Sequence, residues 1–157
     1  MPMSIEICCV SKRPPGWAQN LIDDYIRRAH DLFKISYKYV APAPDRMSSA
    51  EALRDEGRRL LRALPRDTHL VALAVDGRVL DSEAMAKQLG NYQDRNLSLA
   101  LVIGGANGLS PDVLAAAQST WSLSALTLPH MLVQVVLAEQ LYRAWSILRR
   151  HPYHLGH

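Results

Sequence analysis

The chain of 157 residues lacks several features that mark particular classes of protein. It has only two cysteines, the adjacent Cys8 and Cys9. Neighbours in a strand point to opposite faces, so these two thiols are poorly placed to form a disulfide with each other. There is no CxxC pair and no cysteine–histidine spacing typical of a metal site. We therefore expect two reduced, buried thiols in a reducing compartment.

Long apolar runs and targeting segments are also missing. The first residues lack a basic stretch followed by an apolar one, so no secretory leader is predicted. The most apolar stretch, residues 131–148, contains Gln134, Glu139, Gln140 and Arg143, which argues against a membrane span. These observations predict a cytoplasmic protein that does not enter a membrane.

Acidic residues are scarce in the last third of the chain. Residues 97–157 contain only Asp112 and Glu139, which disfavours a metal-dependent site there. Over the whole chain the net charge is +3, and fourteen of the eighteen basic residues are arginine, which favours an anionic partner. Arg54, Arg58 and Arg62 share one face of a predicted helix. That face is either a phosphate-contacting stripe or a solvated surface paired with nearby acids.

Hydrophobic periodicity and turn residues predict strands that alternate with helices. The strands are expected at residues 4–10, 35–40, 69–75, 97–103 and 120–123, and the helices at 17–29, 48–63, 82–89, 111–117 and 127–150. Asp76-Gly77 is expected to form a turn, and Gly90 to end its helix. The length fits one domain over residues 1–157, and the alternation predicts an α/β fold with a mostly parallel sheet flanked by helices.

Ligands of open α/β sheets bind at the carboxyl ends of the strands. This rule selects residues 73–77 and 104–108. The second segment, Gly104-Gly105-Ala106-Asn107-Gly108, is neither a dinucleotide fingerprint nor a phosphate-binding loop. Glycines nevertheless allow a ligand to approach the backbone, although a tight turn without a ligand explains them equally well.

The last predicted helix is apolar on nearly all sides, which indicates burial, in part by a second subunit. Within it, Glu139 and Arg143 have the spacing of a simple ion pair along the helix. The tail that follows contains His151, Tyr153 and His154. These side chains can move protons or contact a base, unless the tail is merely a terminus without fixed structure.

Five stretches of the second half resemble the ribosomal large-subunit methyltransferase H family, whose members are small SPOUT-class enzymes that use S-adenosylmethionine. The matching stretches are residues 101–105 (LVIGG), 108–111 (GLSP), 121–130 (WSLSALTLPH), 138–147 (AEQLYRAWSI) and 151–154 (HPYH). The resemblance extends more loosely over the whole chain.

The resemblance implies a C-terminal trefoil knot, a homodimer joined through the last helix, and methylation of N3 of a pseudouridine in helix 69 of 23S rRNA in the assembled ribosome. It implies that Arg143, Tyr153 and His154 are catalytic, with His154 the candidate base or proton relay. It assigns the S-adenosylmethionine site to Leu73, Gly104, Gly105, Leu123, Ser124, Ala125, Leu126, Thr127 and Leu128. No metal is implied, because the sulfonium already activates the methyl group.

Two other functions fit the same residues. One is a SPOUT methyltransferase with another RNA substrate, and the other is a non-catalytic protein that binds RNA or the ribosome. The chain also departs from its relatives at three places. Asn107 replaces a usual Glu, Gln134 replaces a usual basic residue, and residues 155–157 replace a usual basic ending. These departures concern RNA affinity rather than binding of the methyl donor.

Overall fold

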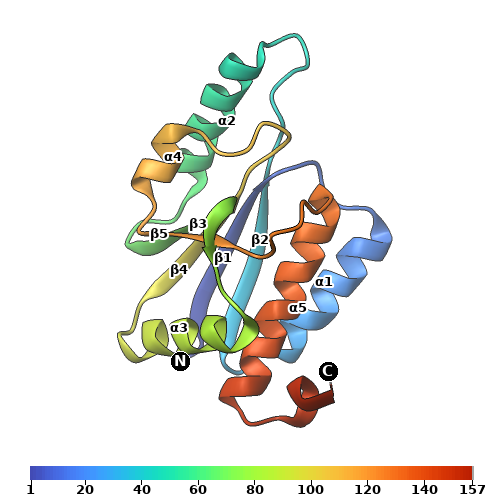
Figure 1. The fold of residues 1–157 in the computed structure, drawn as a ribbon, viewed down its shortest axis with the longest axis vertical. Coiled ribbons are helices and arrows are strands. Elements are labelled where there is room, and N and C mark those ends of the chain that lie inside the picture. Colours follow the sequence, from blue (N-terminus) through green and yellow to red (C-terminus); the bar gives the residue numbers. More distant parts are fainter. Residues whose placement is uncertain (157) are drawn as a thin grey trace.

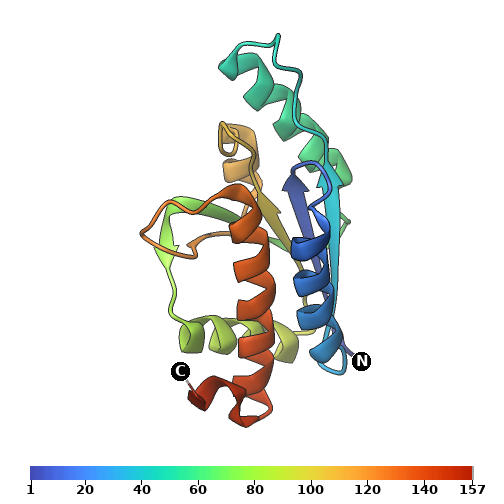
Figure 2. The same ribbon diagram turned by 90° about the vertical axis from the view of Figure 1, so that its right-hand side faces the viewer.

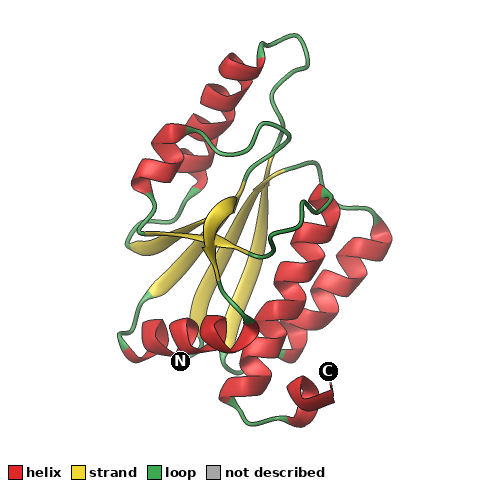
Figure 3. Ribbon diagram, in the orientation of Figure 1, coloured by secondary structure: helices red, strands yellow, loops and turns green. Residues whose placement is uncertain are grey.

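The computed structural model describes residues 1–156 as one sheet with helices on both faces (Figures 1 and 3). The elements are β1 (Met3–Val10), α1 (Gly16–Arg28), β2 (Phe33–Val40), α2 (Ser49–Ala63), β3 (Thr68–Val79), α3 (Ser82–Asp94), β4 (Ser98–Ile103), α4 (Pro111–Ala116), β5 (Ser119–Ser122), α5 (His130–Leu148) and a short 3₁₀ helix (Pro152–Gly156). This alternation confirms the predicted α/β fold.

The five strands have the order β2-β1-β4-β3-β5, and every neighbouring pair is parallel. Consequently the carboxyl ends of all the strands lie at the same edge of the sheet, the upper edge in Figure 1. The strand β2 lies at one side of the sheet, with its outer edge unpaired within the described residues. The order places the ends of β1, β4 and β3 next to one another.

Alternating side chains divide the core into two layers. In β1, Ile5, Ile7 and Cys9 pack with residues of α3 and α5, whereas Cys8 and Val10 pack with residues of α2 and α4. Strands buried on both faces read as nearly continuous apolar runs, as β1 and β4 do. Both cysteines are free and buried, in opposite layers, as predicted.

Two predicted boundaries are wrong. Instead of turning at Asp76-Gly77, β3 continues to Val79, with a register shift where Leu73 and Arg78 both oppose Trp121 of β5. Such an irregularity bends a strand without ending it. A Cβ on Gly77 would lie 2.7 Å from the Trp121 carbonyl carbon, so the glycine allows β3 and β5 to approach closely. The helix α3 likewise continues through Gly90 to Asp94. There a Cβ would lie 3.2 Å from Leu148 Cδ2, so the glycine serves close packing against α5.

The last helix, α5, lies beside α1 and runs from the carboxyl edge of the sheet towards the opposite end of the molecule (Figures 1 and 2). It begins at His130, three residues later than predicted. Across residues 1–156 we find no helix with the length and apolar character that crossing a bilayer requires. The trefoil knot implied by the resemblance stays a prediction.

Candidate functional site

A cavity of about 930 Å³ opens at the carboxyl edge of the sheet. Its volume is within the range of small-molecule sites. It is lined by the ends of β1, β3 and β4, by the loop between β5 and α5, and by the first turn of α5. The lining comprises residues 10–12, 42, 73–76, 103–109, 114, 122–124, 126–128, 130, 131 and 133. The strand-end rule therefore selected two of the segments that meet here.

Eight of the nine residues assigned to the methyl donor line this one cavity. They are Leu73, Gly104, Gly105, Leu123, Ser124, Leu126, Thr127 and Leu128. The ninth, Ala125, is exposed and is not part of the lining. Leu73 of β3, the turn after β4 and the loop after β5 are far apart in the sequence, and the fold brings them together around one cavity.

The glycine turn after β4 is set by its own backbone. A Cβ on Gly104 would overlap the carbonyl oxygen of Gly108, and the Gly108 N–H donates to the Gly105 carbonyl at 3.0 Å. Gly108 has a φ of 78°, a conformation that favours glycine. A Cβ on Gly105 would lie 3.0 Å from Val10 Cγ1 on the cavity wall. The glycines keep the turn narrow, and the turn forms one side of the cavity.

The loop between β5 and α5 contains no charged residue and is stiffened by its own serines. Ser122 Oγ donates to the Ser124 carbonyl at 2.8 Å, and Ser124 Oγ accepts from the Leu126 N–H at 2.9 Å. The main-chain N–H groups of Thr127 and Leu128 have no hydrogen-bond partner among residues 1–156. These donors are available to a ligand in the cavity.

The cavity has few charged or titratable groups. Lys12 and Asp76 line it, together with His130 at the start of α5. Burial lowers the pKa of His130, which favours its neutral form. The apolar walls, the unpaired main-chain donors, and one carboxylate and one ammonium group fit S-adenosylmethionine, which carries a nucleoside and both charges of an amino acid. Sequence reasoning missed Lys12 because only the order of the strands reveals that β1 ends beside β4.

The three predicted catalytic residues gather around the second half of α5. Arg143 Nη2 lies 2.6 Å from Glu139 Oε2, and the Tyr153 hydroxyl donates to the same oxygen at 2.8 Å. The Arg143 guanidinium carbon is 5.1 Å from the centre of the Tyr153 ring. Burial, and then the bond to Glu139, raise the pKa of Tyr153, while the bond to Glu139 raises the pKa of Arg143. The phenol therefore keeps its proton, and the guanidinium keeps its charge.

The tautomer of His154 follows from the contacts of the fully buried Ser146. Ser146 Oγ donates to the main-chain carbonyl of His151 at 2.8 Å and accepts from the main-chain N–H of His154 at 3.1 Å. It also lies 2.7 Å from the ring nitrogen Nδ1 of His154. A hydroxyl has one proton, and the carbonyl can only accept. The proton between Ser146 Oγ and His154 Nδ1 must therefore belong to Nδ1. In the neutral ring this leaves Nε2 as a proton acceptor.

One chain does not bring these residues to the cavity. Arg143 lies thirteen residues after His130 along α5, a rise of roughly 20 Å at about 1.5 Å per residue. The first turn of α5 lines the cavity, and the C-terminal tail lies at the opposite end of this helix (Figure 2). The two groups of predicted site residues are therefore separate within a single copy.

Two other sequence expectations have mixed outcomes. Asp55 pairs with Arg59 at 2.9 Å and with Arg58 at 3.6 Å, which is the solvated-surface alternative for part of α2. Glu56 is buried instead, and its carboxylate accepts a hydrogen bond from the Ala43 N–H at 2.8 Å.

Gln134 is fully buried, with its amide nitrogen 3.2 Å from His130 Nε2. The Gln134 side chain thus lies in the interior of this copy, where it is not exposed to a phosphate.

The chain is similar in sequence to known methyltransferases over nearly its whole length. A family model described as predicted SPOUT methyltransferase matches residues 3–154. Two relatives named ribosomal RNA large subunit methyltransferase H cover 97% of this chain and 99% of their own length. They come from Alkalilimnicola ehrlichii, at 46% identity, and Chromohalobacter salexigens, at 38%.

Solved structures give the same fold at low sequence identity. A probable methyltransferase from Bordetella pertussis superposes with a TM-score of 0.56 at 16% identity, covering 92% of this chain and 95% of its own. A probable methylase family protein from Haemophilus influenzae gives 0.52 at 12% identity, covering 96% of this chain and 69% of its own. The chain therefore belongs to the SPOUT methyltransferases and, within them, to the ribosomal RNA large subunit methyltransferase H family.

Proposed function

We propose that this protein transfers a methyl group from S-adenosylmethionine to N3 of a pseudouridine in helix 69 of 23S rRNA, in the assembled ribosome of the cytoplasm. The observation that carries the proposal is the end-to-end match to ribosomal RNA large subunit methyltransferase H at 46% identity. The cavity adds support, because eight of the nine residues that the resemblance assigns to the donor line one space.

The donor is held mainly by main-chain groups. The loop after β5, including Thr127 and Leu128, offers unpaired N–H donors, and the glycine turn lets a ligand lie against the backbone. Asp76 and Lys12 are the charged groups available for the amino-acid end of the donor. When bound, S-adenosylmethionine supplies an electrophilic methyl group on a sulfonium.

The chain's own catalytic work is to orient the base and to move one proton. Nε2 of His154 is the proton acceptor for N3, because Nδ1 is committed to Ser146. Arg143 keeps its positive charge beside the base and stabilises the negative charge that develops there. Tyr153 keeps its proton and donates it to Glu139, so it orients the base by packing and does not act as a base itself.

These groups reach the cavity only if a second copy supplies them. Reacting atoms must come within about 3–3.5 Å, whereas Arg143 and His130 of one chain are separated by roughly 20 Å along α5. Large apolar side chains are exposed on the neighbouring helices α1 and α5: Trp17 by 54%, Leu21 by 42% and Leu132 by 40%. We infer a homodimer in which this surface is covered and the tail of each copy serves the cavity of the other.

Two measurements test the proposed function. Titration calorimetry should detect binding of S-adenosylmethionine, and no binding would favour a non-catalytic protein. Mass mapping of rRNA from a strain lacking the gene should show loss of one methylpseudouridine in helix 69. An unchanged helix 69, together with loss of a methyl group elsewhere, would instead indicate another RNA substrate.

A further inference from the structure

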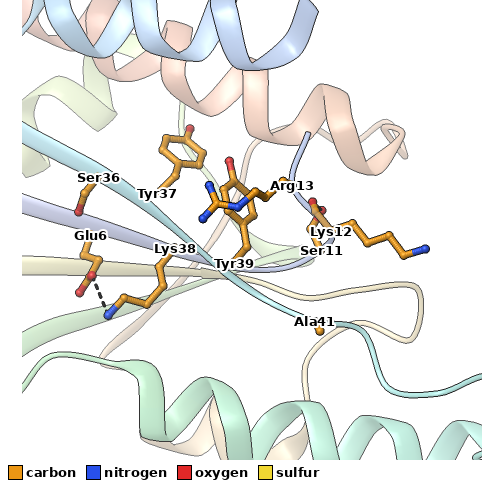
Figure 4. Close-up of a pocket in the computed structure, with 9 residues that line it drawn as sticks. All are labelled: Glu6, Ser11, Lys12, Arg13, Ser36, Tyr37, Lys38, Tyr39 and Ala41. Atoms are coloured by element: carbon orange, nitrogen blue, oxygen red, sulfur yellow. Dashed lines mark hydrogen bonds and ion pairs between the residues drawn. The ribbon is translucent and has the colours of Figure 1, made fainter. Parts of the chain in front are cut away.

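A second cavity, of about 540 Å³, lies at the outer edge of the sheet (Figure 4). We call it the β2-edge pocket. It is lined by Glu6, Ser36, Tyr37, Lys38, Tyr39 and Ala41 of β1, β2 and the residue after β2, and by Ser11, Lys12 and Arg13 of the loop after β1. None of these residues is needed for the proposed proton transfer.

The β2-edge pocket carries two positively charged side chains, Lys12 and Arg13, that form no ion pair within the described residues. Its single carboxylate, Glu6, lies 3.1 Å from the Lys38 ammonium and neutralises it. Within residues 1–156 the side chains of Lys12 and Arg13 form no ion pair and no hydrogen bond, and both residues are exposed. Arg13 extends back towards Tyr39, whereas Lys12 extends away from it (Figure 4). An anion can therefore approach Arg13 without displacing an internal partner, while Lys12, at the border of the two cavities, is the cation assigned to the donor.

Tyr39 adds a neutral donor beside these cations. Its hydroxyl is buried and has no partner in the described part of the chain. Burial raises the pKa of Tyr39 to about 12, while the nearby Arg13 acts in the opposite direction. The phenol thus stays protonated near neutral pH.

The β2-edge pocket adjoins the larger cavity, because Ser11 and Lys12 line both. A polyanion with one unit in the larger cavity would therefore pass Lys12 and reach Arg13. Arginine and lysine beside an open groove are the groups that bind phosphate along a nucleic-acid strand. We propose that the β2-edge pocket binds a phosphodiester of the RNA strand next to the target nucleotide, and this identification of the strand rests on the proposed function.

The role assigned to this pocket is positional. Phosphate contacts fix the register and orientation of a strand but do not read its sequence. Loss of one contact should therefore weaken RNA binding, and should leave donor binding and the rate at saturating RNA unchanged. An effect on RNA binding alone distinguishes this pocket from the residues that bind the donor or transfer the proton.

The test compares Arg13→Gln with Lys34→Gln. Lys34 is exposed on β2 and does not line the pocket, so its loss changes the net charge equally. The probe is large ribosomal subunits that lack the methyl group. Arg13→Gln should raise the KM for the subunits about fivefold at 0.1 M salt, and should lower the slope of log affinity against log salt by about 0.7, the value expected for one contact. Its kcat and its donor affinity by calorimetry should match those of the wild type.

Three results would overturn the proposal: an unchanged KM and salt slope in Arg13→Gln, equal effects of Lys34→Gln, or loss of donor affinity in Arg13→Gln. Failure of the proposed function is a separate outcome, in which the wild type methylates no large subunits. In that case the salt dependence of binding to the same subunits still compares the two variants. An unaltered slope for Arg13→Gln would then refute the phosphate site by itself.

Discussion

At the scale of the residue, one buried hydroxyl decides which nitrogen of a candidate base is free. Ser146 holds His154 Nδ1 and the His151 carbonyl at once, which leaves Nε2 unprotonated in the neutral ring. Sequence could not have shown this arrangement, because it depends on the tail folding back over α5. The resemblance pointed to His154 but not to the serine that orients it.

Ser146→Ala should therefore slow methylation more than it weakens binding. Without the hydroxyl, nothing holds Nδ1–H, and the imidazole is free to rotate or to protonate Nε2. We expect a fall in kcat of roughly tenfold or more, since general bases contribute about 10²-fold or more. Donor affinity should be unchanged. Stopped assays at saturating RNA, together with nitrogen NMR of the imidazole, measure the two effects.

Ser48→Ala is the control, since it removes a serine hydrogen bond with the Glu51 N–H at the start of α2, away from α5 and the tail. It should leave both kcat and the imidazole spectrum as in the wild type. An Nε2–H tautomer in the neutral wild-type protein would contradict the assignment directly, whatever the activity of the variants.

Gly105→Val should weaken donor binding at least tenfold and leave a folded protein. The branched side chain starts 3.0 Å from Val10 Cγ1, so it must displace the wall of the cavity or enter it. Calorimetry with S-adenosylmethionine measures the loss. Gly16→Ala is the control, because a Cβ there has no neighbour within 4 Å. Normal donor affinity in Gly105→Val would remove this turn from the donor site.

At the scale of the element, sequence patterns located the helices and strands but not all their ends. Nearly continuous apolar runs mark β1 and β4 because both strands are buried on two faces. The extension of β3 past Gly77 depends on pairing with β5, and that of α3 past Gly90 depends on contact with Leu148. Both glycines serve tertiary contacts, which a local pattern does not reveal.

His69, at the start of β3, should make stability depend on pH. Burial, and then the charge of Arg95, lower its pKa below the ordinary 6.5. As the pH falls below about 6.5 the unfolded chain takes up a proton that the folded state refuses, so the free energy of unfolding declines. The centre of the His69 ring lies 4.5 Å from the centre of the Tyr92 ring. His69→Phe replaces the imidazole with an aromatic ring that packs there but does not titrate. Its stability should fall less between pH 7 and pH 5.5, as measured by urea denaturation.

Thr68→Val provides the comparison for that experiment. It removes a neighbouring hydrogen bond to the Pro65 carbonyl but no titrating group. Its stability should therefore decline with pH as steeply as that of the wild type. The prediction is refuted if His69→Phe retains the full wild-type decline.

At the scale of the whole molecule, the separation of cavity and tail leads to a test by mixing. His154→Ala keeps a working cavity, and Gly105→Val keeps a working tail. If each cavity is served by the other copy's tail, the mixed dimer has one intact site. Random exchange should then restore about a quarter of wild-type activity, because half of the two-fold dimers are mixed and each has one site.

Formation of mixed dimers is verified first, by size and by tags on the two variants. If the activity then stays at the level of the inactive parents, each tail serves its own chain. The relation between tail and cavity is the part of the site that sequence describes least. Motifs gave the residues of both groups, but only the length and direction of α5 reveal the distance between them.

The positions of Cys8 and Cys9 have a practical consequence for the whole fold. Burial raises the pKa of Cys8 to about 11 and raises that of Cys9 as well, so neither thiolate forms readily while the sheet is intact. The two side chains lie on opposite faces of β1, each covered by a different layer of helices. Alkylating reagents can therefore modify each thiol only after its own layer of helices has separated from the sheet. The natural chain thus contains two probes, one per layer, for the order in which its helices detach during unfolding.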